Sequence, residues 1–368
     1  MASYEIVVDH GRPVQDEPDR CHNRWHPEIP PVLSCRPGDE ILLGTRDAVD
    51  GQFTLDSSHD DVLRIDRWIV HPLTGPVRVE GADPGDVLVV EILEIVPASF
   101  GYTAQIPGFG FLADEFPAPF LVRWEIADGF ATSPDLPGVR IPGEPFMGTM
   151  GVAPSRDLLE LITRRERALK EQGEDVVLPD PRGAVPATEP VASEGLRTKP
   201  PRENGGNLDV RQMVAGTRIL FPVWTEGGLF SAGDGHFAQG DGESCGTAIE
   251  MRATLRVRLD LRKGEAAKRG VRDVRFESPA ADLDARPGRT FSTTGLCVYA
   301  EGGGRANDLT VAAKNALRNM IEHLVHEFGC SRQQAYAICS VAVDLKVGEI
   351  VDSPNYVVTA TVPIEIFQ

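Results

Sequence analysis

The sequence predicts a mainly β protein with a smaller α+β portion near its C-terminus. Its 368 residues are rich in glycine (37) and proline (29) and only 7% are aromatic, a composition typical of many turns and short strands. Residues 252–262 alternate between apolar and mostly charged side chains, which is the pattern of a strand with one buried face. Two helical patterns and a strand then close the chain, after a long β-rich body.

The first segment, residues 1–150, is expected to form a β-rich domain. Short apolar runs between Pro/Gly turns predict strands at Tyr4–Val8, Glu40–Gly44, Pro76–Glu80 and Asp86–Val96. The last run follows a turn sequence, Asp-Pro-Gly, and carries apolar residues on both faces. We therefore expect this strand to be buried on both sides.

The central region, residues 151–262, combines three patterns. Ser155 is a good N-cap for an amphipathic helix that runs to Gly173. Residues 174–206 are crowded with proline and charge, and they form either a surface excursion or a lid over a site. Strand patterns return over residues 217–262, where the charged side chains of the alternating strand are expected to form a solvated face.

The C-terminal segment, residues 263–368, has α+β character. An apolar stripe at helical spacing predicts a helix over Leu309–Phe328, with Gly329 as its stop. The segment Ser331–Gln334 has the spacing of a capping box, so a further short helix is predicted to begin there. A strand is predicted over Tyr356–Phe367.

Charge and composition exclude several classes of function. The formal net charge is −18 and no basic cluster occurs, which disfavours nucleic-acid binding. No apolar run reaches the length of a membrane span, and the N-terminus lacks the basic and apolar regions of a secretory signal. The six cysteines are scattered without a CxxC pair, a pattern of reduced thiols. We expect a cytoplasmic protein that binds neither nucleic acid nor membrane.

One glycine-rich stretch, Ser231–Gly246, concentrates residues that can carry chemistry. Asp234 and His236 are two positions apart, so in an extended chain they project from the same face as a pair of metal ligands. Asp241 and Glu243 repeat this spacing on the far side of a turn. Glycine lets the backbone approach a ligand closely. A Gly/Asp-rich turn with incidental polar residues is the alternative interpretation.

This stretch contains the groups that a hydrolase needs. Hydrolysis requires an activated water, a proton shuttle and a group that stabilises the developing negative charge. Asp234 and His236 could hold a metal ion that activates water, while Glu243 serves as base and then donates the proton to the leaving nitrogen. The glycine-rich backbone or Gln239 could hold the oxyanion.

An upstream segment, Pro201–Asp209, has similar character. Asn207 and Asp209 share a face if the chain is extended, and the two preceding glycines permit a tight approach. Asp209 could add a carboxylate ligand. A surface turn is the alternative interpretation.

Two other hypotheses remain open. Cys245 could act as a thiol nucleophile through a thioester intermediate, although the loop holds no Lys or Arg to lower its pKa. The chain could instead be a non-catalytic protein that binds a small molecule. Ser244 fits the GxSxG pattern literally, but a strand pattern follows it where that motif requires a helix.

Several longer strings resemble the formamidase/acetamidase family, and the similarity covers almost the whole chain. These strings are HPLTGPVRVEGADPGD (71–86), GFGFL (108–112), PRENGGNLD (201–209), GDGHFAQGDGE (233–243), AYAICSVAVDL (335–345) and VDSPN (351–355). The resemblance implies a β-sandwich or barrel-like amidohydrolase that acts on short aliphatic amides, usually as a homo-oligomer. Some relatives open small cyclic amides, so a γ-lactam is a further expected substrate.

The resemblance also implies a site at the glycine-rich stretch, with Asp234, His236 and Glu243 carried over directly and with Asp209 and His71 as further contributors. We therefore predict a hydrolase that cleaves the C–N bond of a small linear or cyclic amide with metal-activated water. A divalent metal, zinc, is our own inference. The expected metal ligands are Asp234, His236, Asp209 and His71; the expected catalytic residues are Glu243, Asp241 and Gln239; Asn207 and Gly235 are expected to bind substrate.

Overall fold

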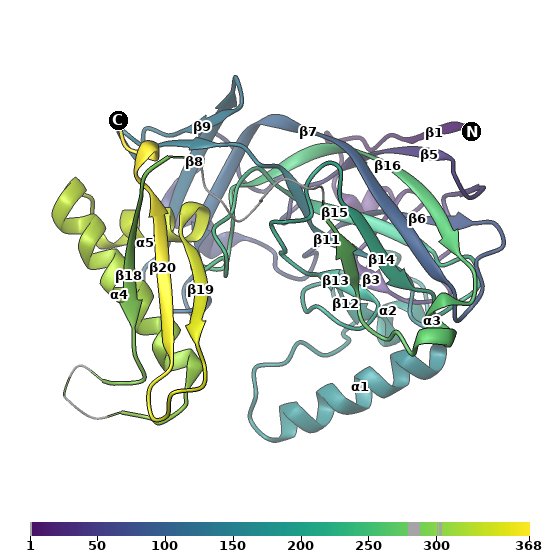
Figure 1. Cartoon of the computed structure of the whole chain (residues 1–368). Coiled ribbons are helices and arrows are strands. Elements are labelled where there is room, and N and C mark those ends of the chain that lie inside the picture. The colour runs from purple at the N-terminus through teal and green to yellow at the C-terminus, as the bar shows by residue number, and fades with distance from the viewer. Residues whose placement is uncertain (1, 279–287, 300, 302–303) are drawn as a thin grey trace.

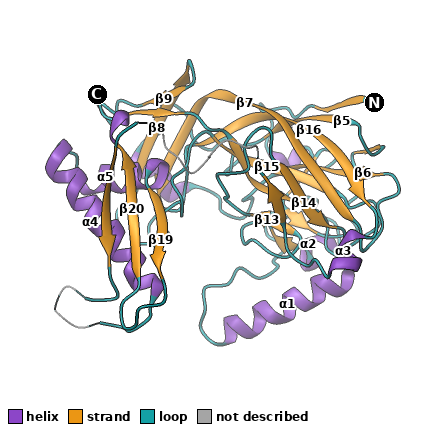
Figure 2. Cartoon of the chain, in the orientation of Figure 1, coloured by secondary structure: helices purple, strands orange, loops and turns teal. Residues whose placement is uncertain are grey.

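The computed structural model describes residues 2–278, 288–299, 301 and 304–368. Strands hold 34% of the residues and helices 19%, so the predicted mainly β fold is confirmed. A large β-rich body carries the N-terminus, and a smaller part, built from α4 (Leu309–Phe328), α5 (Arg332–Ala342) and a three-stranded sheet, carries the C-terminus (Figures 1 and 2).

Most strands belong to one fifteen-stranded sheet. Its members are β1 (Ser3–Ile6), β2 (Cys21–His22), β4 (Leu33–Cys35), β5 (Glu40–Thr45), β6 (Leu73–Val79), β7 (Val87–Gln105), β8 (Phe120–Ala127), β9 (Phe130–Thr132), β10 (Arg140–Pro142), β11 (Phe146–Gly151), β13 (Gly205–Asn207), β14 (Arg218–Pro222), β15 (Phe230–His236), β16 (Glu250–Arg262) and β17 (Arg275–Glu277). Its main path runs β10-β9-β8-β7-β16-β15-β11-β13.

The long antiparallel pair of β7 and β16 forms the centre of this sheet. The first residues of β7, Val87–Val90, are buried on both faces as predicted, but over Glu91–Val96 one face is partly exposed, so the prediction holds only for the first part of the strand. The strand is longer than predicted and continues to Gln105, because its second half pairs with β8 although its sequence has no apolar run. Backbone pairing within a sheet does not require an apolar pattern.

The alternating pattern of β16 behaves as predicted. Its apolar residues, such as Leu255 and Val257, are fully buried. Its arginines lie on the other, partly exposed face, where Arg256 and Arg258 pair with Glu40 at 2.5 and 2.7 Å. The arginines of the exposed face therefore form ion pairs with a neighbouring strand as well as contacts with solvent.

Smaller elements flank the main sheet. The helix α1 (Arg156–Glu171) begins as predicted, with the Ser155 hydroxyl accepting a hydrogen bond from Leu158 N at 3.1 Å. The strands β3 (Arg24–Trp25) and β12 (Leu196–Arg197) form a separate pair. The remaining elements of the body are α2 (Val191–Glu194), α3 (Glu265–Arg269), and two 3-10 helices at Val14–Asp16 and His59–Arg64.

The C-terminal part packs two helices on a three-stranded sheet of order β18-β20-β19. The predicted helix over Leu309–Phe328 is α4, and the predicted capping box opens α5 (Arg332–Ala342). The strands are β18 (Thr290–Gly295), β19 (Asp344–Glu349) and β20 (Val357–Pro363).

The last predicted strand, Tyr356–Phe367, is too long at its C-terminal end. After β20 the chain turns into a 3-10 helix over Ile364–Ile366. Pro363 has no backbone N–H to donate to a neighbouring strand, which explains why the ladder stops there.

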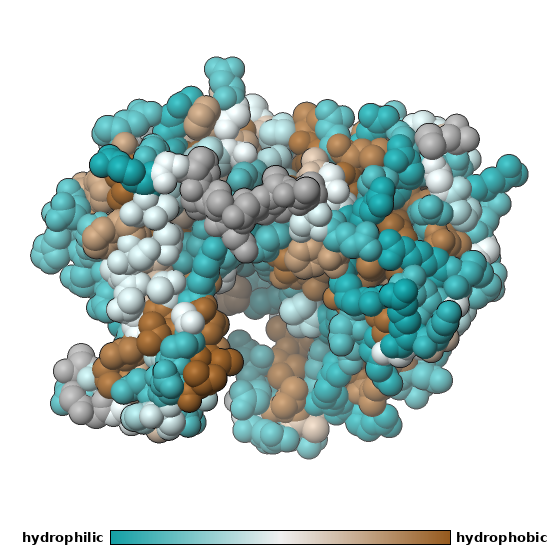
Figure 3. Space-filling view, viewed as in Figure 1, coloured by the Kyte–Doolittle hydropathy of each residue, from teal (hydrophilic) through white to brown (hydrophobic). Residues whose placement is uncertain are grey.

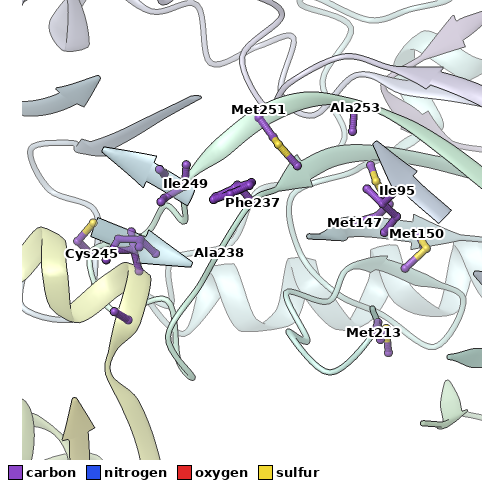
Figure 4. Close-up of a cluster of buried hydrophobic side chains, with 14 of the residues drawn as sticks. Ile95, Met147, Met150, Met213, Phe237, Ala238, Cys245, Ile249, Met251 and Ala253 are labelled. Carbon is purple, nitrogen blue, oxygen red and sulfur yellow. The ribbon is translucent and has the colours of Figure 1, made fainter. Parts of the chain in front are cut away.

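The largest of the five apolar clusters in the described residues extends through both parts of the molecule. It contains residues of the main sheet, such as Leu43 and Leu255, and residues of the C-terminal part, such as Leu317 and Val358. Figure 4 shows part of this core, where Phe237 lies close to Met251. The main sheet takes strands from both segments 1–150 and 151–262, and the division into three domains stays a prediction.

No helix in the described part of the chain is long and apolar enough to cross a bilayer. On the surface, exposed apolar side chains lie close together in sequence at the end of β19, where Val347, Ile350 and Val351 are 54%, 52% and 79% exposed. Apolar residues are visible at that end of the C-terminal part in Figure 3.

Candidate active site

The strand β15 carries the centre of the candidate site. It pairs antiparallel with β11, β6 and β16, so all its residues are buried. Asp234 and His236 lie on it, as the spacing predicted, and Asp234 Oδ1 is 3.5 Å from His236 Nε2. Two polar side chains are therefore held inside the sheet at one place.

Asp209 joins this pair from the loop that follows β13. Its Oδ1 lies 3.9 Å from His236 Nε2. Asn207 donates to Asp209 Oδ2 at 2.5 Å, and Thr149 donates to Asn207 Oδ1 at 2.7 Å. Since Thr149 Oγ1 is also 3.1 Å from Asp234 Oδ2, one hydrogen-bonded network holds both aspartates.

His71 approaches the centre from the segment before β6. Its Nε2 lies 4.0 Å from Asp234 Oδ2. Thr198 fixes this histidine through its backbone: the Thr198 hydroxyl accepts from His71 N at 2.6 Å and donates to His71 O at 3.0 Å. The structure thus brings all four predicted metal ligands close together.

Glu250, which the sequence analysis missed, is also at the centre. It is the first residue of β16, and its Oε2 lies 3.1 Å from His236 Nε2 without the alignment of a hydrogen bond. Glu243 completes this group, since one ligand atom from each of His236, Glu243 and Glu250 lies within 4.8 Å of the others. A signal existed: Glu250 interrupts the apolar run Ala248–Met251, and buried carboxylates are rare unless they are paired.

Gln239 orients two of these side chains. Its Oε1 is 2.9 Å from His236 Nδ1, and its Nε2 donates to the backbone oxygen of Asp209 at 2.8 Å. A hydrogen bond at Nδ1 leaves Nε2 to face the centre. The amide of Gln239 therefore positions the predicted ligands.

Two predicted site residues are not brought to the centre. The Asp241 carboxylate pairs with Arg211 Nε at 2.9 Å and does not line the cavity described below. Gly235 faces β16, where an added Cβ would lie 2.9 Å from Met251 O. Its missing side chain serves close packing of the sheet at that point.

A different glycine leaves the space between the ligands. A Cβ added at Gly148 of β11 would lie 2.6 Å from Asp209 Oδ1, 2.7 Å from His236 Cε1 and 2.8 Å from Asp234 Oδ2. No side chain larger than hydrogen fits there without displacing the centre. The only hint in the sequence is that β11 contains two glycines within a buried strand.

The polar atoms of the centre face one another without partners. Among the described residues, Asp209 Oδ1, Asp234 Oδ1, His236 Nε2 and Glu250 Oε2 are buried and have no hydrogen-bond acceptor or donor. Burying such atoms unsatisfied costs about 1–3 kcal/mol each, and more for charged groups. Imidazole nitrogen and carboxylate oxygen are the donors that bind zinc and related divalent ions, so the residues present fit a metal ion.

Backbone strain concentrates at the same residues. Asp209, Asp234 and Glu243 have φ of 49°, 61° and 43°. Residues other than glycine rarely adopt this left-handed backbone conformation, and each residue held in it lowers the free energy of unfolding by on the order of 1–3 kcal/mol. Such residues cluster at functional sites, where the surrounding structure enforces their conformation.

Burial and crowding shift the pKa values of these groups. Burial raises the pKa of Glu243 to about 8 and that of Glu250 to about 8, against the opposing effect of the His236 charge. Burial alone would also raise the pKa of Asp234, but the charges of His71 and His236 lower it. The site thus holds carboxylates whose pKa values are shifted in opposite directions, which is typical of sites that perform acid–base catalysis.

The centre opens on a cavity of about 340 Å³. Asp234, Glu243 and Glu250 lie at its polar end, while Phe53, Trp68, Phe109 and other apolar side chains form its walls. The segment 174–206 contributes Asp175, Val177, Arg197 and Lys199 to the wall, so part of this excursion covers the site. Cavities of this size and character bind small organic molecules.

Cys245 lies outside this cavity. It is fully buried, its backbone N–H donates to Ser340 Oγ at 3.0 Å, and burial raises the pKa of its thiol to about 11. A thiol in this environment is protonated at neutral pH and is a poor nucleophile. The geometry gives no support to a thioester mechanism.

A cluster of buried acids and imidazoles at the end of an apolar cavity defines an enzyme that performs acid–base chemistry on a small molecule. Comparison with known proteins identifies the family. Residues 7–368 match the model of the acetamidase/formamidase family. The chain is 38% identical to an acetamidase of Mycolicibacterium smegmatis, over 92% of this chain and 89% of that one. It is 36% identical to a formamidase of Methylophilus methylotrophus, over 99% and 93%.

Solved structures agree with this assignment. A gamma lactamase from Delftia acidovorans superposes with a TM-score of 0.93 at 35% identity, over 100% of this chain and 93% of that one. An acetamidase of Bacillus halodurans gives a TM-score of 0.57 at 26% identity, over 94% and 96%. The chain therefore belongs to the acetamidase/formamidase family and is an amidohydrolase, as the sequence predicted.

The environment of Cys245 leads to a test of the thiol hypothesis. Iodoacetamide should label the partly exposed Cys330 well before the buried Cys245, which timed labelling and peptide mass spectrometry can measure. A Cys245→Ala variant should keep most of its amide turnover and lose about 1 kcal/mol of stability from the small cavity. A folded Cys245→Ala protein without activity would restore the thiol mechanism.

Proposed function

We propose that this enzyme hydrolyses the C–N bond of a small linear or cyclic amide at the centre formed by β15 and its neighbours, with a divalent ion, zinc, as cofactor. The observation that carries the proposal is the convergence of unpartnered buried atoms from Asp209, Asp234 and His236, whose ligand atoms lie within 4.8 Å of one another. A cation between them would satisfy all three, and the unpartnered Glu250 lies beside His236 in a second group with Glu243.

The proposed ion is held by Asp209, Asp234 and His236, with His71 as a further ligand. Imidazole nitrogen favours zinc over magnesium or calcium. When bound, such an ion supplies Lewis-acid activation of water. Gln239 and the Thr149–Asn207 pair hold the ligand side chains in place, which is how outer contacts tune metal sites.

Glu243 is proposed to move the proton. It lines the cavity beside His236, and burial raises its pKa to about 8, near the range that suits a proton shuttle at neutral pH. Glu243 takes a proton as the water oxygen bonds to the amide carbon. It returns this proton to the nitrogen as the C–N bond breaks, which yields a carboxylic acid and ammonia or an amine.

The names of the relatives support the substrate class. They are an acetamidase, a formamidase and a gamma lactamase, so both linear and cyclic amides are proposed here. A homo-oligomer and a cytoplasmic location stay predictions. The exposed apolar residues at the end of β19 offer a surface that a second copy could cover.

The proposed function is tested by product release from a panel of amides. Formamide, acetamide, propionamide and a bicyclic γ-lactam are each assayed with and without chelator, with metal content measured in parallel. We expect turnover that chelation abolishes and zinc restores. Turnover unaffected after complete metal removal would exclude the metal-dependent mechanism, and absence of turnover across the panel would contradict the proposed activity.

The role of Glu243 predicts the behaviour of a single variant. Glu243→Gln should lower kcat by roughly 10²- to 10⁴-fold, since general acid–base groups contribute about that much, while metal content stays intact. Asp241→Asn is the matched comparison: it lies two residues away but binds Arg211, so its main effect should be on stability. Equal losses of kcat in both variants, or normal activity in Glu243→Gln, would contradict the assignment.

Gly148 provides a test of the metal site that does not depend on turnover. Gly148→Ala places a methyl group within 2.6–2.8 Å of Asp209, His236 and Asp234 atoms. We expect zinc bound per chain to fall strongly, as measured by elemental analysis after dialysis. Gly44→Ala, on strand β5 where an added Cβ makes only ordinary contacts at 3.4 Å or more, controls for the loss of a glycine from the sheet. Full zinc content in Gly148→Ala would show that the ion does not sit between these side chains.

A further inference from the structure

The wall of the cavity carries a cluster of cations. Arg67, Arg197 and Lys199 all line it, and the remaining acidic residue of this wall is the exposed Asp175. Lys199 lies over the ring of Phe109, with its Nζ 4.2 Å from the ring centroid. This local positive charge contrasts with the chain as a whole, which has 55 acidic and 37 basic residues.

These cations have no carboxylate partner among the residues that the structure describes. Arg197 is 3% exposed, and its Nη2 donates a hydrogen bond to the backbone oxygen of Arg67 at 2.9 Å. Its buried Nε has no hydrogen-bond partner in the described chain. Burial lowers the pKa of Lys199; the charge of the exposed Asp175 opposes this shift, and the charges of Arg67 and Arg197 add to it.

Three other buried arginines of this protein form ion pairs, whereas the buried Arg24 donates to backbone and amide oxygens only. Arg46 Nη1 lies 2.6 Å from Asp50, Arg202 Nε lies 2.6 Å from Glu166, and Arg211 Nη2 lies 3.3 Å from Asp344. Burying a charge is unfavourable unless it is paired, and this chain has an excess of carboxylates available. The buried Arg197 and the partly buried Lys199 therefore leave positive charge at the cavity that no carboxylate of the described chain neutralises in an ion pair, whereas Arg67 is exposed to solvent.

The cation cluster is tied to the reaction centre by one residue. Thr198, between Arg197 and Lys199, makes both hydrogen bonds to the backbone of His71. A ligand that fills the cavity would thus be within reach of both the centre and these cations. The volume of about 340 Å³ exceeds that of about ten waters at roughly 30 Å³ each, which is far more than formamide or acetamide occupies.

We propose that the preferred substrate is an amide whose acyl part carries a carboxylate, and that Lys199, with Arg197 and Arg67, binds this carboxylate. The inference rests on the proposed function, which places the amide group at the Asp234–His236 centre. Hydrolysis of such a monoamide breaks the C–N bond, adds water across it and yields a dicarboxylate and ammonia. The diffuse negative charge of the protein would repel this substrate, so the local cations are needed to admit it.

The test compares monoamides of straight-chain dicarboxylic acids of three to six carbons with neutral amides of equal length, such as succinamate with butanamide. We expect the best monoamide to exceed its neutral counterpart in kcat/KM by about tenfold or more, because charge-assisted hydrogen bonds in partly buried sites contribute at least that factor. In Lys199→Gln this ratio should fall to about one, whereas Lys199→Arg should preserve it. Lys314→Gln is the matched control, since Lys314 also lies over a phenylalanine ring, 5.4 Å from the centroid of Phe111, but outside the cavity.

The outcomes separate this inference from the proposed function. Turnover of neutral amides with no preference for a carboxylate, or a preference that Lys199→Gln retains, overturns the inference and leaves amide hydrolysis standing. Absence of turnover for every amide overturns the proposed function. Calorimetry with succinate then decides the inference, because a carboxylate site requires binding that weakens about tenfold in Lys199→Gln but not in Lys314→Gln. Equal affinity in both variants overturns it.

Discussion

Carboxylates placed side by side in a dry interior repel one another, and each loses its hydration on burial. That penalty amounts to several kcal/mol per ion in real proteins unless a countercharge and hydrogen bonds offset it. In this enzyme Asp209, Asp234, Glu243 and Glu250 share one small volume with His236, and the fold must hold them there in spite of the cost. The arrangement is explained if a cation belongs among them.

Several features of the surrounding structure hold these buried acids in place. Gln239 and Thr149 hold His236 and Asp234 by hydrogen bonds, and the backbone is strained at three of the acids, Asp234 in β15 and Asp209 and Glu243 in loops. Arg211 connects the glycine-rich loop to the C-terminal part, because it binds both Asp241 at 2.9 Å and Asp344 at 3.3 Å. Asp241, which the sequence suggested as a catalytic residue, is thus part of the frame that keeps the loop in place.

The sequence alone could predict what depends on local pattern. The mainly β class, the helices α1, α4 and α5 with their caps, and the glycine-rich site segment all follow from periodicity, turn chemistry or residue clustering. The extent of β7 and the end of β20 were harder to predict, because they depend on pairing with β8 and on one proline. Boundaries of elements are set as much by tertiary contacts as by propensity.

The site itself was predictable only in part. Asp234, His236 and Glu243 lie close in sequence, so clustering was sufficient to find them. Glu250 and Gly148 were missed because their roles arise from the sheet: Glu250 faces His236 across the β15–β16 pair, and Gly148 faces it from β11. Gly235 lies in a sequence typical of ligand-binding loops, yet the pairing of β15 with β16 places it against a neighbouring strand. Which side of a strand meets a cavity depends on pairing that no local pattern encodes.

The two hydrogen bonds between Thr198 and His71 have a consequence for how this enzyme can change over evolution. The same short peptide supplies part of the cavity wall and the support of a residue at the reaction centre. Substrate range and catalytic activity therefore cannot change independently here, because a change of backbone at Arg197 or Lys199 that reshapes the wall would also move Thr198 and its hydrogen bonds to His71. Val177, by contrast, lines the cavity but makes no hydrogen bond to the residues of the centre. Substitutions at such positions can change which amides fit without disturbing the catalytic residues.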